Sequence, residues 1–231
     1  RIAPAPPRPA AAEVAALPLG QDAPEPRTDP FGESMRNGMV VSGGTTPGPV
    51  FRRLARVPLD WQRVTVLPSD ERWVPPDDAD SNERLLRGTL LTDEAATASL
   101  AGLYRDGTDP AGACAALERD WPGLPLPFAA CLLGMGADGH FASLFPDFAG
   151  LDDALAPDGD AHFVPVATRA SPHPRISLTL AALARSREIV LLFFGEEKRQ
   201  VFESARRGAT GLPVAALLAR SPAPLSVVWA P

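Results

Sequence analysis

The chain has 231 residues, of which 27 are proline, 19 are glycine and two are cysteine. A chain of this length fits one α/β domain and buries enough surface to need no disulfide or structural metal. Its 22 basic and 28 acidic side chains give a formal net charge of −6, which argues against a dedicated nucleic-acid-binding protein. Two cysteines, Cys114 and Cys131, are too few for a disulfide framework or a four-ligand zinc site, so we expect buried free thiols in a reducing compartment.

No apolar run reaches the ~18 residues that a membrane span needs, and prolines interrupt the N-terminus where a signal peptide would be apolar. We therefore expect a cytoplasmic protein that makes no membrane contact. Residues 1–38 contain eight prolines, which remove backbone donors and break helices. We predict an irregular segment over residues 1–37, with at most a short helix near Ala10–Leu17, and one α/β domain over residues 38–231.

From residue 38 onward, apolar runs of strand length alternate with patterns typical of helices. Strands are predicted at Gly38–Val41, Arg63–Leu67, Phe128–Leu133, His162–Ala167, Glu188–Phe194 and Leu225–Trp229. Helices are predicted at Pro47–Ala55, Asp80–Leu91, Pro110–Trp121, Ser177–Arg185, Glu196–Arg207 and Pro213–Leu218. The expected N-caps are Thr46, Ser81 or Asp80, and Asp109. This alternation predicts a mostly parallel sheet with helices on both faces, whose ligands bind beyond the carboxyl ends of the strands.

Two loops that follow predicted strands carry groups suited to a small polar ligand. Ser42–Pro47 (SGGTTP) offers two glycines, three hydroxyls and the first N–H groups of a helix, which suit a phosphate; an ordinary tight turn is equally consistent. Ser69–Pro75 (SDERWVP) places two acids and an arginine at a strand end, where they can bind sugar hydroxyls or steer a proton. By composition alone, a solvated charged loop explains the second segment better.

The segment Gly134–His140 (GMGADGH) also follows a predicted strand. It contains the glycine spacing of a dinucleotide-binding turn, but Pro146 follows too soon for a helix and no acid ends a second strand, so we discount a nicotinamide enzyme. The Asp138-Gly139-His140 triplet is more specific, because it puts an imidazole on a flexible turn with a carboxylate two residues away. Histidine titrates near neutral pH and can take a proton from water and return it.

Two further basic residues lie where an anion would bind. Arg175 stands between a proline-stiffened segment and the predicted helix Ser177–Arg185, and a fixed guanidinium makes a good phosphate clamp. Lys198, the single lysine of the chain, opens a helix directly after a strand. An ordinary surface position remains an alternative for both.

Together these segments resemble the 6-phosphogluconolactonase family, relatives of the glucosamine-6-phosphate deaminases. The matching stretches follow the family's order: SGGTTP (42–47), DERWVP with SN (70–75, 81–82), GMGADGHFASLFP (134–146), SPHPRISLT (171–179), GEEK (195–198) and WAP (229–231). The resemblance implies a Rossmann-like, three-layer α/β domain. It also implies hydrolysis of 6-phospho-D-glucono-1,5-lactone to 6-phospho-D-gluconate, the second step of the oxidative pentose phosphate pathway, with no cofactor and no essential metal.

The resemblance also implies roles for individual residues. His140 matches the general base that activates water against the lactone carbonyl. The implied catalytic residues are His140, Asp138 and Asp70. The implied substrate-binding residues are Gly43, Gly44, Thr45, Arg72, Arg175 and Lys198. A lactone is an activated ester, so a positioned water, one base and donors for the oxyanion suffice. We expect a small sugar phosphate as the ligand, and a monomer or weak homodimer.

Other interpretations stay open. Family members usually carry a first strand and a long alanine-rich helix before the SGG loop, and residues 1–38, with their eight prolines, cannot form that helix. We therefore expect a replaced, truncated or mis-framed N-terminus. One alternative is a non-catalytic sugar-phosphate-binding protein on the same fold. The other is a glucosamine-6-phosphate deaminase-like isomerase, although Ala142–Pro146 lacks the acid of that family's AFNEP-type loop.

Overall fold

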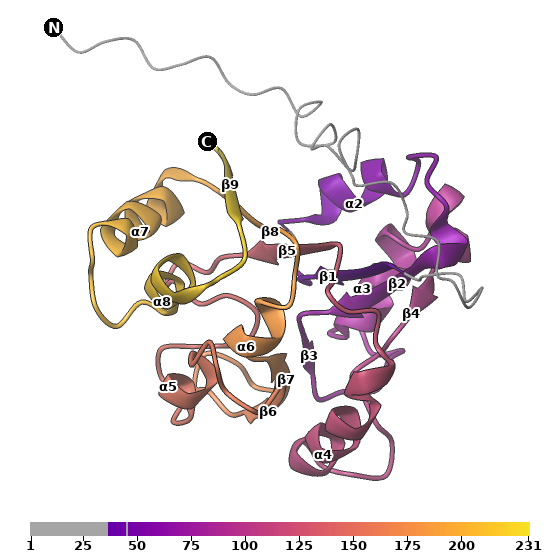
Figure 1. Ribbon diagram of the computed structural model, residues 1–231, viewed down its shortest axis with the longest axis horizontal. Coiled ribbons are helices and arrows are strands. Elements are labelled where there is room, and N and C mark those ends of the chain that lie inside the picture. The colour runs from indigo at the N-terminus through magenta and orange to yellow at the C-terminus, as the bar shows by residue number, and fades with distance from the viewer. Residues whose placement is uncertain (1–36, 45) are drawn as a thin grey trace, which may run out of the picture.

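The computed structural model describes residues 37–44 and 46–231, so the predictions for residues 1–36 lie outside the described part (Figure 1). Six parallel strands form the larger sheet, in the spatial order β4-β2-β1-β5-β8-β9. They are β1 (Asn37–Val41), β2 (Val64–Pro68), β4 (Ser99–Leu100), β5 (Ala130–Gly134), β8 (Ile189–Phe194) and β9 (Leu225–Ala230). A smaller antiparallel sheet has the order β3-β7-β6 and consists of β3 (Asp70–Arg72), β7 (Arg175–Leu178) and β6 (Phe163–Val166).

The helices follow the strands closely in chain order. They are α2 (Gly48–Leu54), α3 (Asn82–Thr89), α4 (Pro110–Asp120), α5 (Leu151–Ala154), α6 (Leu180–Leu183), α7 (Glu196–Arg206) and α8 (Pro213–Arg220), with 3-10 turns at Trp61–Arg63, Asp93–Thr97 and Trp121–Gly123. Ser81 and Asp109 cap α3 and α4 as predicted, each accepting a backbone N–H of the first turn. The predicted Thr46 cap is wrong, because Pro47 occupies the N-cap of α2 and no side chain caps that helix.

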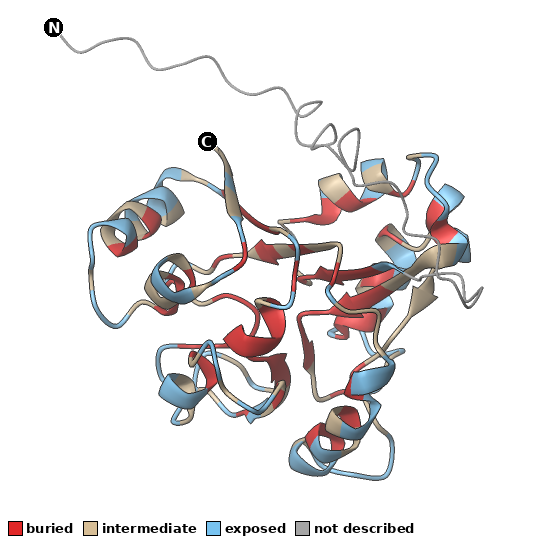
Figure 2. Cartoon of the chain, in the orientation of Figure 1, coloured by how far each residue is buried: buried red, intermediate tan, exposed pale blue. Residues whose placement is uncertain are grey.

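The apolar core lies on both faces of the larger sheet. Successive residues of β1 point to opposite faces, as the pleat of a strand requires. Met39 and Val41 pack in one buried cluster with Phe51 and Trp61, whereas Val40 belongs to the other cluster. Figure 2 shows buried residues along the central strands and more exposed ones on the outer faces of the helices. The structure thus confirms a mostly parallel sheet covered on both faces.

The smaller sheet differs from the sequence-based expectation. A helix was predicted over Ser177–Arg185, but Arg175–Leu178 forms β7, which pairs with both β3 and β6, and only Leu180–Leu183 is helical. Pairing with two neighbouring strands outweighs the local helical pattern, and Thr179 then caps α6 through its side chain. Arg175 therefore begins a strand, and the expected position just before a helix is wrong.

The remaining sequence-based expectations concern the cysteines and the membrane. Cys114 and Cys131 are buried free thiols, as predicted. Burial raises the pKa of Cys114 to about 12, with the charges of Glu118 and Asp109 adding to the effect. Burial also raises the pKa of Cys131 far above its usual range. In residues 37–44 and 46–231, no helix combines the length and apolar character that crossing a membrane requires.

Candidate active site

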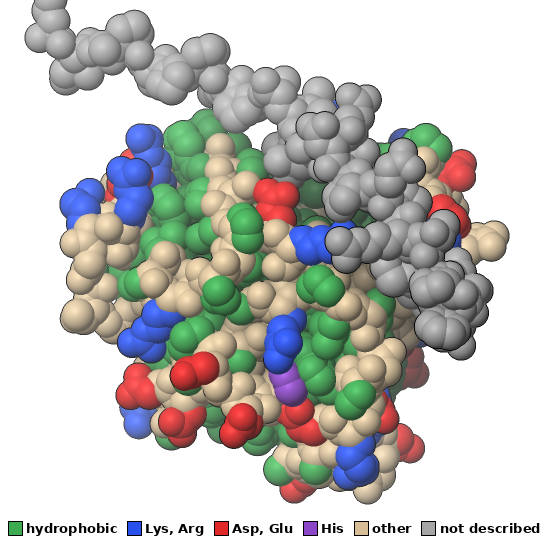
Figure 3. Space-filling model, viewed as in Figure 1, with side chains coloured by type: hydrophobic (Ala, Val, Ile, Leu, Met, Phe, Trp, Pro, Cys, Tyr) green, Lys and Arg blue, Asp and Glu red, His purple; other side chains and the backbone are tan. Residues whose placement is uncertain are grey.

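A pocket of about 340 Å³ opens where the carboxyl ends of β1, β5 and β8 meet the smaller sheet. Its position agrees with the predicted binding edge of a parallel sheet. Seven of the predicted site residues line it: Gly43, Gly44, Asp70, Arg72, His140, Arg175 and Lys198. Asp138 contacts His140 from outside the lining, and Thr45 lies outside the described residues. On the face drawn in Figure 3, a histidine side chain lies among basic and acidic side chains.

The turn after β5 holds the His140 ring in one orientation. Gly139 has a φ of +78°, and the N–H of Gly136 donates to the His140 carbonyl at 2.9 Å. The Nδ1 atom of His140 lies 2.6 Å from Asp138 Oδ1, and the ring packs at a centroid distance of 4.2 Å on Phe145. Because a carboxylate only accepts, Nδ1 carries the proton and Nε2 keeps a lone pair. His140 is therefore arranged to accept a proton at Nε2.

Asp138 supports this arrangement electrostatically. Partial burial raises its pKa, but the hydrogen bond and charge of His140 outweigh that effect and bring the pKa below the usual value for aspartate. Oδ1 also accepts the backbone N–H of His140 at 3.2 Å. A carboxylate that stays ionised in this position stabilises an imidazolium that forms when His140 takes a proton.

Three cationic side chains reach the pocket from different elements. Arg72 comes from β3, Arg175 from β7 and Lys198 from the first turn of α7, which follows the left-handed residue Gly195. Burial lowers the pKa of Arg175, while the charge of Asp70 opposes that change. Three cations around one pocket are suited to binding a phosphate.

Asp70 is bound on both of its carboxylate oxygens by side chains of the chain itself. Oδ1 accepts from the hydroxyl of Ser69 at 2.8 Å, and Oδ2 accepts from the hydroxyl of Ser143 at 2.6 Å. Arg175 Nη1 lies 3.6 Å from the same Oδ2. The interpretation of Ser69–Pro75 as a solvated charged loop is therefore wrong for Asp70–Arg72, which form strand β3 with Asp70 and Glu71 both buried.

Two functional neighbours of the pocket were not identified as such from the sequence. Glu71 accepts the backbone N–H groups of Asn82 and Glu83 at 2.7 Å each, which fixes the start of α3. Burial raises the Glu71 pKa despite these hydrogen bonds. Asn82 lines the pocket and donates to the Asp70 carbonyl at 2.8 Å. The sequence offered one signal for Asn82, the Ser81-Asn82 pair at the start of a predicted helix. Helix capping by Ser81 was a sufficient explanation for that pair, so it did not indicate a pocket residue.

The pocket and the His140 turn are built without a cluster of metal-binding side chains. Among residues 37–44 and 46–231, no three His, Cys, Asp or Glu side chains come together as metal ligands do. The chemistry that the geometry offers is proton transfer at His140 Nε2 beside a cationic pocket.

Comparison with known proteins identifies the family. The family model described as glucosamine-6-phosphate isomerases/6-phosphogluconolactonase matches residues 28–229. The 6-phosphogluconolactonase of Caulobacter vibrioides is 45% identical over 197 residues, covering 84% of each chain. That of Pseudomonas aeruginosa is 40% identical over 195 residues, covering 84% of this chain and 81% of the relative. A crystal structure of a 6-phosphogluconolactonase from Shewanella baltica, 36% identical, superposes with a TM-score of 0.80 and covers 85% of this chain and 84% of that one. The chain belongs to the glucosamine-6-phosphate isomerase/6-phosphogluconolactonase family.

Proposed function

We propose that this chain hydrolyses 6-phospho-D-glucono-1,5-lactone to 6-phospho-D-gluconate, the second step of the oxidative pentose phosphate pathway. The relatives with 40–45% identity that carry this enzyme's name span most of the chain. One observation of the structure carries the proposal: His140, whose Nδ1 lies 2.6 Å from Asp138, lines a pocket that Arg72, Arg175 and Lys198 also line. A base beside a cationic pocket is what a phosphorylated lactone requires.

In the proposed mechanism, His140 Nε2 takes a proton from water while the water oxygen attacks the lactone carbonyl carbon. The carbonyl electrons move to oxygen and form a tetrahedral oxyanion. Collapse of this oxyanion breaks the bond between the carbonyl carbon and the ring oxygen. The imidazolium returns its proton to that ring oxygen, which becomes a hydroxyl, and the new carboxylic acid ionises. Asp138 stabilises the imidazolium while it exists.

The phosphate of the substrate is proposed to bind away from the reacting carbonyl. Arg175 and Lys198 supply positive charge, and the phosphate lies against the loop that contains Gly43 and Gly44. Gly43 leaves room for the Asn82 side chain, because a Cβ there would clash with Asn82 Oδ1. Binding energy from such a remote group orients the carbonyl toward the water and the base. Arg72 and Asp70 complete the wall on the side of β3.

The experiment that tests this function compares wild type with His140→Ala on freshly generated lactone, after subtraction of spontaneous hydrolysis. We expect kcat to fall about 10²–10⁴-fold with a modest change in KM. Arg175→Ala should instead raise KM strongly. His162→Gln is the matched control, because His162 stacks on Trp121 and bonds to Glu118 away from the pocket.

Three outcomes decide the matter. Fast hydrolysis by wild type and near-background hydrolysis by His140→Ala would support both the reaction and its base. An unchanged kcat in His140→Ala would refute the role of the base. Binding of 6-phosphogluconate by a wild type that does not accelerate hydrolysis would refute the lactonase function and favour a sugar-phosphate-binding protein.

A further inference from the structure

The turn that follows His140 carries a fully buried serine, Ser143, which lies outside the pocket lining. We propose that Ser143 is a positioning residue that sets the placement of Arg175 relative to the His140 turn. The inference rests on the proposed function, in which Arg175 binds the phosphate and His140 is the base. Ser143 touches neither the substrate nor the reacting atoms in this proposal.

Ser143 makes contacts to both sides of the site. Its hydroxyl donates to Asp70 Oδ2 at 2.6 Å and accepts from Arg175 Nη1 at 3.3 Å. Its backbone N–H donates to Ser177 Oγ at 3.1 Å, on the same strand as Arg175. One buried side chain therefore ties the His140 turn to β3 and β7.

The hydrogen bonds that reach Asp70 from the other side run in one direction. The hydroxyl proton of Ser69 goes to Asp70 Oδ1, so the contact of 3.0 Å between Ser42 Oγ and Ser69 Oγ must have Ser42 as its donor. Ser42 in turn accepts the backbone N–H of Gly134 at 3.2 Å. Asp70 thus ends a chain of donors that runs from Gly134 in β5 through Ser42 and Ser69, and it accepts from Ser143 on its other oxygen. Because an ionised carboxylate only accepts, the Ser143 hydroxyl is the donor of that second bond.

The backbone at this turn shows what the contacts of Ser143 must hold in place. Ala142 has a φ of +48°, a left-handed conformation that is unfavourable for a residue with a Cβ. The turn closes with the Leu144 N–H donating to the Phe141 carbonyl at 3.0 Å. A strained backbone persists where surrounding interactions over-determine it. The bonds from Ser143 to β3 and β7 are such interactions, and they fix the turn against the strand that carries Arg175.

Arg175 depends on this support because its charged group is largely enclosed. The guanidinium contacts the Asp70 carboxylate, the Ser143 hydroxyl and the face of the Phe145 ring, 5.3 Å from its centroid. Loss of the hydroxyl removes a donor to Asp70 and an acceptor for Arg175 together. Of these two polar contacts, Arg175 would then keep only the one to Asp70, and no hydrogen bond would fix the guanidinium relative to the His140 turn.

The test compares Ser143→Ala and Ser143→Thr with Ser186→Ala. Ser186 is a matched control because it is also a buried serine and lies outside the pocket lining. Three quantities are measured: kcat and KM for the phosphorylated lactone, the dissociation constant of inorganic phosphate by calorimetry, and the thermal unfolding midpoint. Ser143→Thr keeps the hydroxyl, so recovery of phosphate affinity would separate the hydroxyl from the volume of the side chain.

We expect Ser143→Ala to weaken phosphate binding by about ten- to a hundredfold, with KM rising in parallel and kcat changing less. Ser186→Ala should leave phosphate affinity at the wild-type value. Phosphate affinity that is unchanged in folded Ser143→Ala would overturn the proposal, as would a loss of activity that only tracks the unfolded fraction. If Ser143→Ala does not fold, the same comparison is made with Ser143→Cys, which keeps a weaker donor.

The experiment separates this inference from the proposed function. A wild type that binds phosphate but does not hydrolyse the lactone would refute the function, while the phosphate measurement would still decide the role of Ser143. A wild type that hydrolyses the lactone, with a Ser143→Ala that behaves like Ser186→Ala, would refute the positioning role alone.

Discussion

Replacing Asp138 tests how much the carboxylate contributes through its charge and how much through orientation of the His140 ring. In Asp138→Asn, an amide oxygen can still accept from Nδ1 and from the His140 backbone N–H, which both converge on Oδ1. The ring orientation is therefore kept and the charge is removed. In Asp138→Ala, both hydrogen bonds are removed as well, and the ring keeps only its packing on Phe145.

The magnitudes follow from the strength of these bonds. A hydrogen bond to a charged partner contributes about 1.5–3 kcal/mol, against about 0.5–1.5 kcal/mol for a neutral pair. The Asp138 side chain is 42% exposed, so solvent screening places the loss of charge at the lower end. At about 1.4 kcal/mol per tenfold change in rate, we expect kcat to fall roughly fivefold in Asp138→Asn and about 10²-fold in Asp138→Ala.

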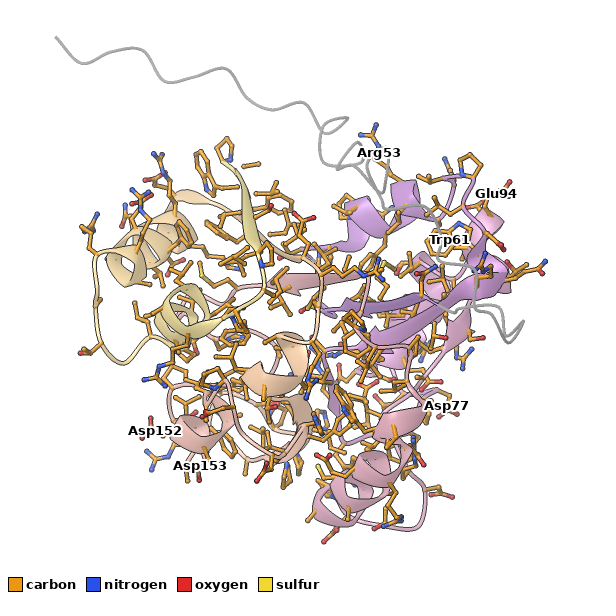
Figure 4. All side chains as sticks on the ribbon, in the orientation of Figure 1. Arg53, Trp61, Asp77, Glu94, Asp152 and Asp153 are labelled. Carbon is orange, nitrogen blue, oxygen red and sulfur yellow. The ribbon has the colours of Figure 1, made fainter. Side chains whose placement is uncertain are left out.

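Both variants are assayed by initial rates on fresh lactone, with spontaneous hydrolysis subtracted. KM should change little, because Asp138 does not line the pocket. The control is Asp153→Asn, since Asp153 projects from α5 at the rim of the molecule (Figure 4). Wild-type kcat in Asp138→Ala, or a loss confined to KM, would refute the reasoning.

Three further predictions concern the fold around the site. Glu71→Gln places an amide NH₂ group against a backbone N–H that the wild-type carboxylate accepts. We therefore expect the free energy of unfolding, measured in urea, to drop by about 1–3 kcal/mol relative to the control Glu94→Gln at the rim of the molecule (Figure 4). Equal stability of the two variants would contradict this prediction. Gly43→Ala brings a Cβ into a clash with the Asn82 amide oxygen, so KM should rise and the thermal midpoint should fall. An unchanged KM and an unchanged midpoint would contradict the close approach of Gly43 and Asn82. The interaction with His140 lowers the Asp138 pKa, so the ionised form stabilises the native state. That stabilisation is complete above the unfolded pKa of about 3.9 and is lost as pH falls through the lower native value. The gap in thermal midpoint between wild type and Asp138→Asn should therefore be larger near neutral pH than at about pH 2, and a gap of equal size at both pH values would contradict the sign.

Elements with strong local signals could be predicted from the sequence. The apolar run Ile189–Phe194 is β8, an interior strand of the larger sheet between β5 and β9, and the Asp109-Pro110 pair starts α4 as expected. In both cases, the interactions that decide the structure lie within a few residues. The loops that follow the predicted parallel strands could be placed at one edge of the sheet, because the carboxyl ends of such strands lie together. Most of the pocket residues could be predicted for this reason.

Of the smaller sheet, only β6 agrees with a predicted strand, His162–Ala167. Strands β3 and β7 could not be predicted, because they are defined by partners far away in the chain. Asp70–Arg72 is charged and short, and it becomes a strand only by pairing with Arg175–Leu178. Burial of Asp70 and Glu71 is offset by hydrogen bonds that no local pattern indicates. Ser143 was missed for the same reason, since its partners Asp70 and Arg175 lie 73 and 32 residues away in the chain.

The cations of the pocket lie in a protein whose formal net charge is −6. An anionic substrate therefore meets repulsion from the molecule as a whole and attraction from Arg72, Arg175 and Lys198 once it is close. Charges more than about 8 Å apart are largely screened at physiological ionic strength, so moderate salt removes the distant repulsion before it weakens the local attraction. We expect the capture of substrate to become faster as ionic strength first rises and slower only at high salt, the reverse of the decline from low salt seen when the whole surface attracts its ligand.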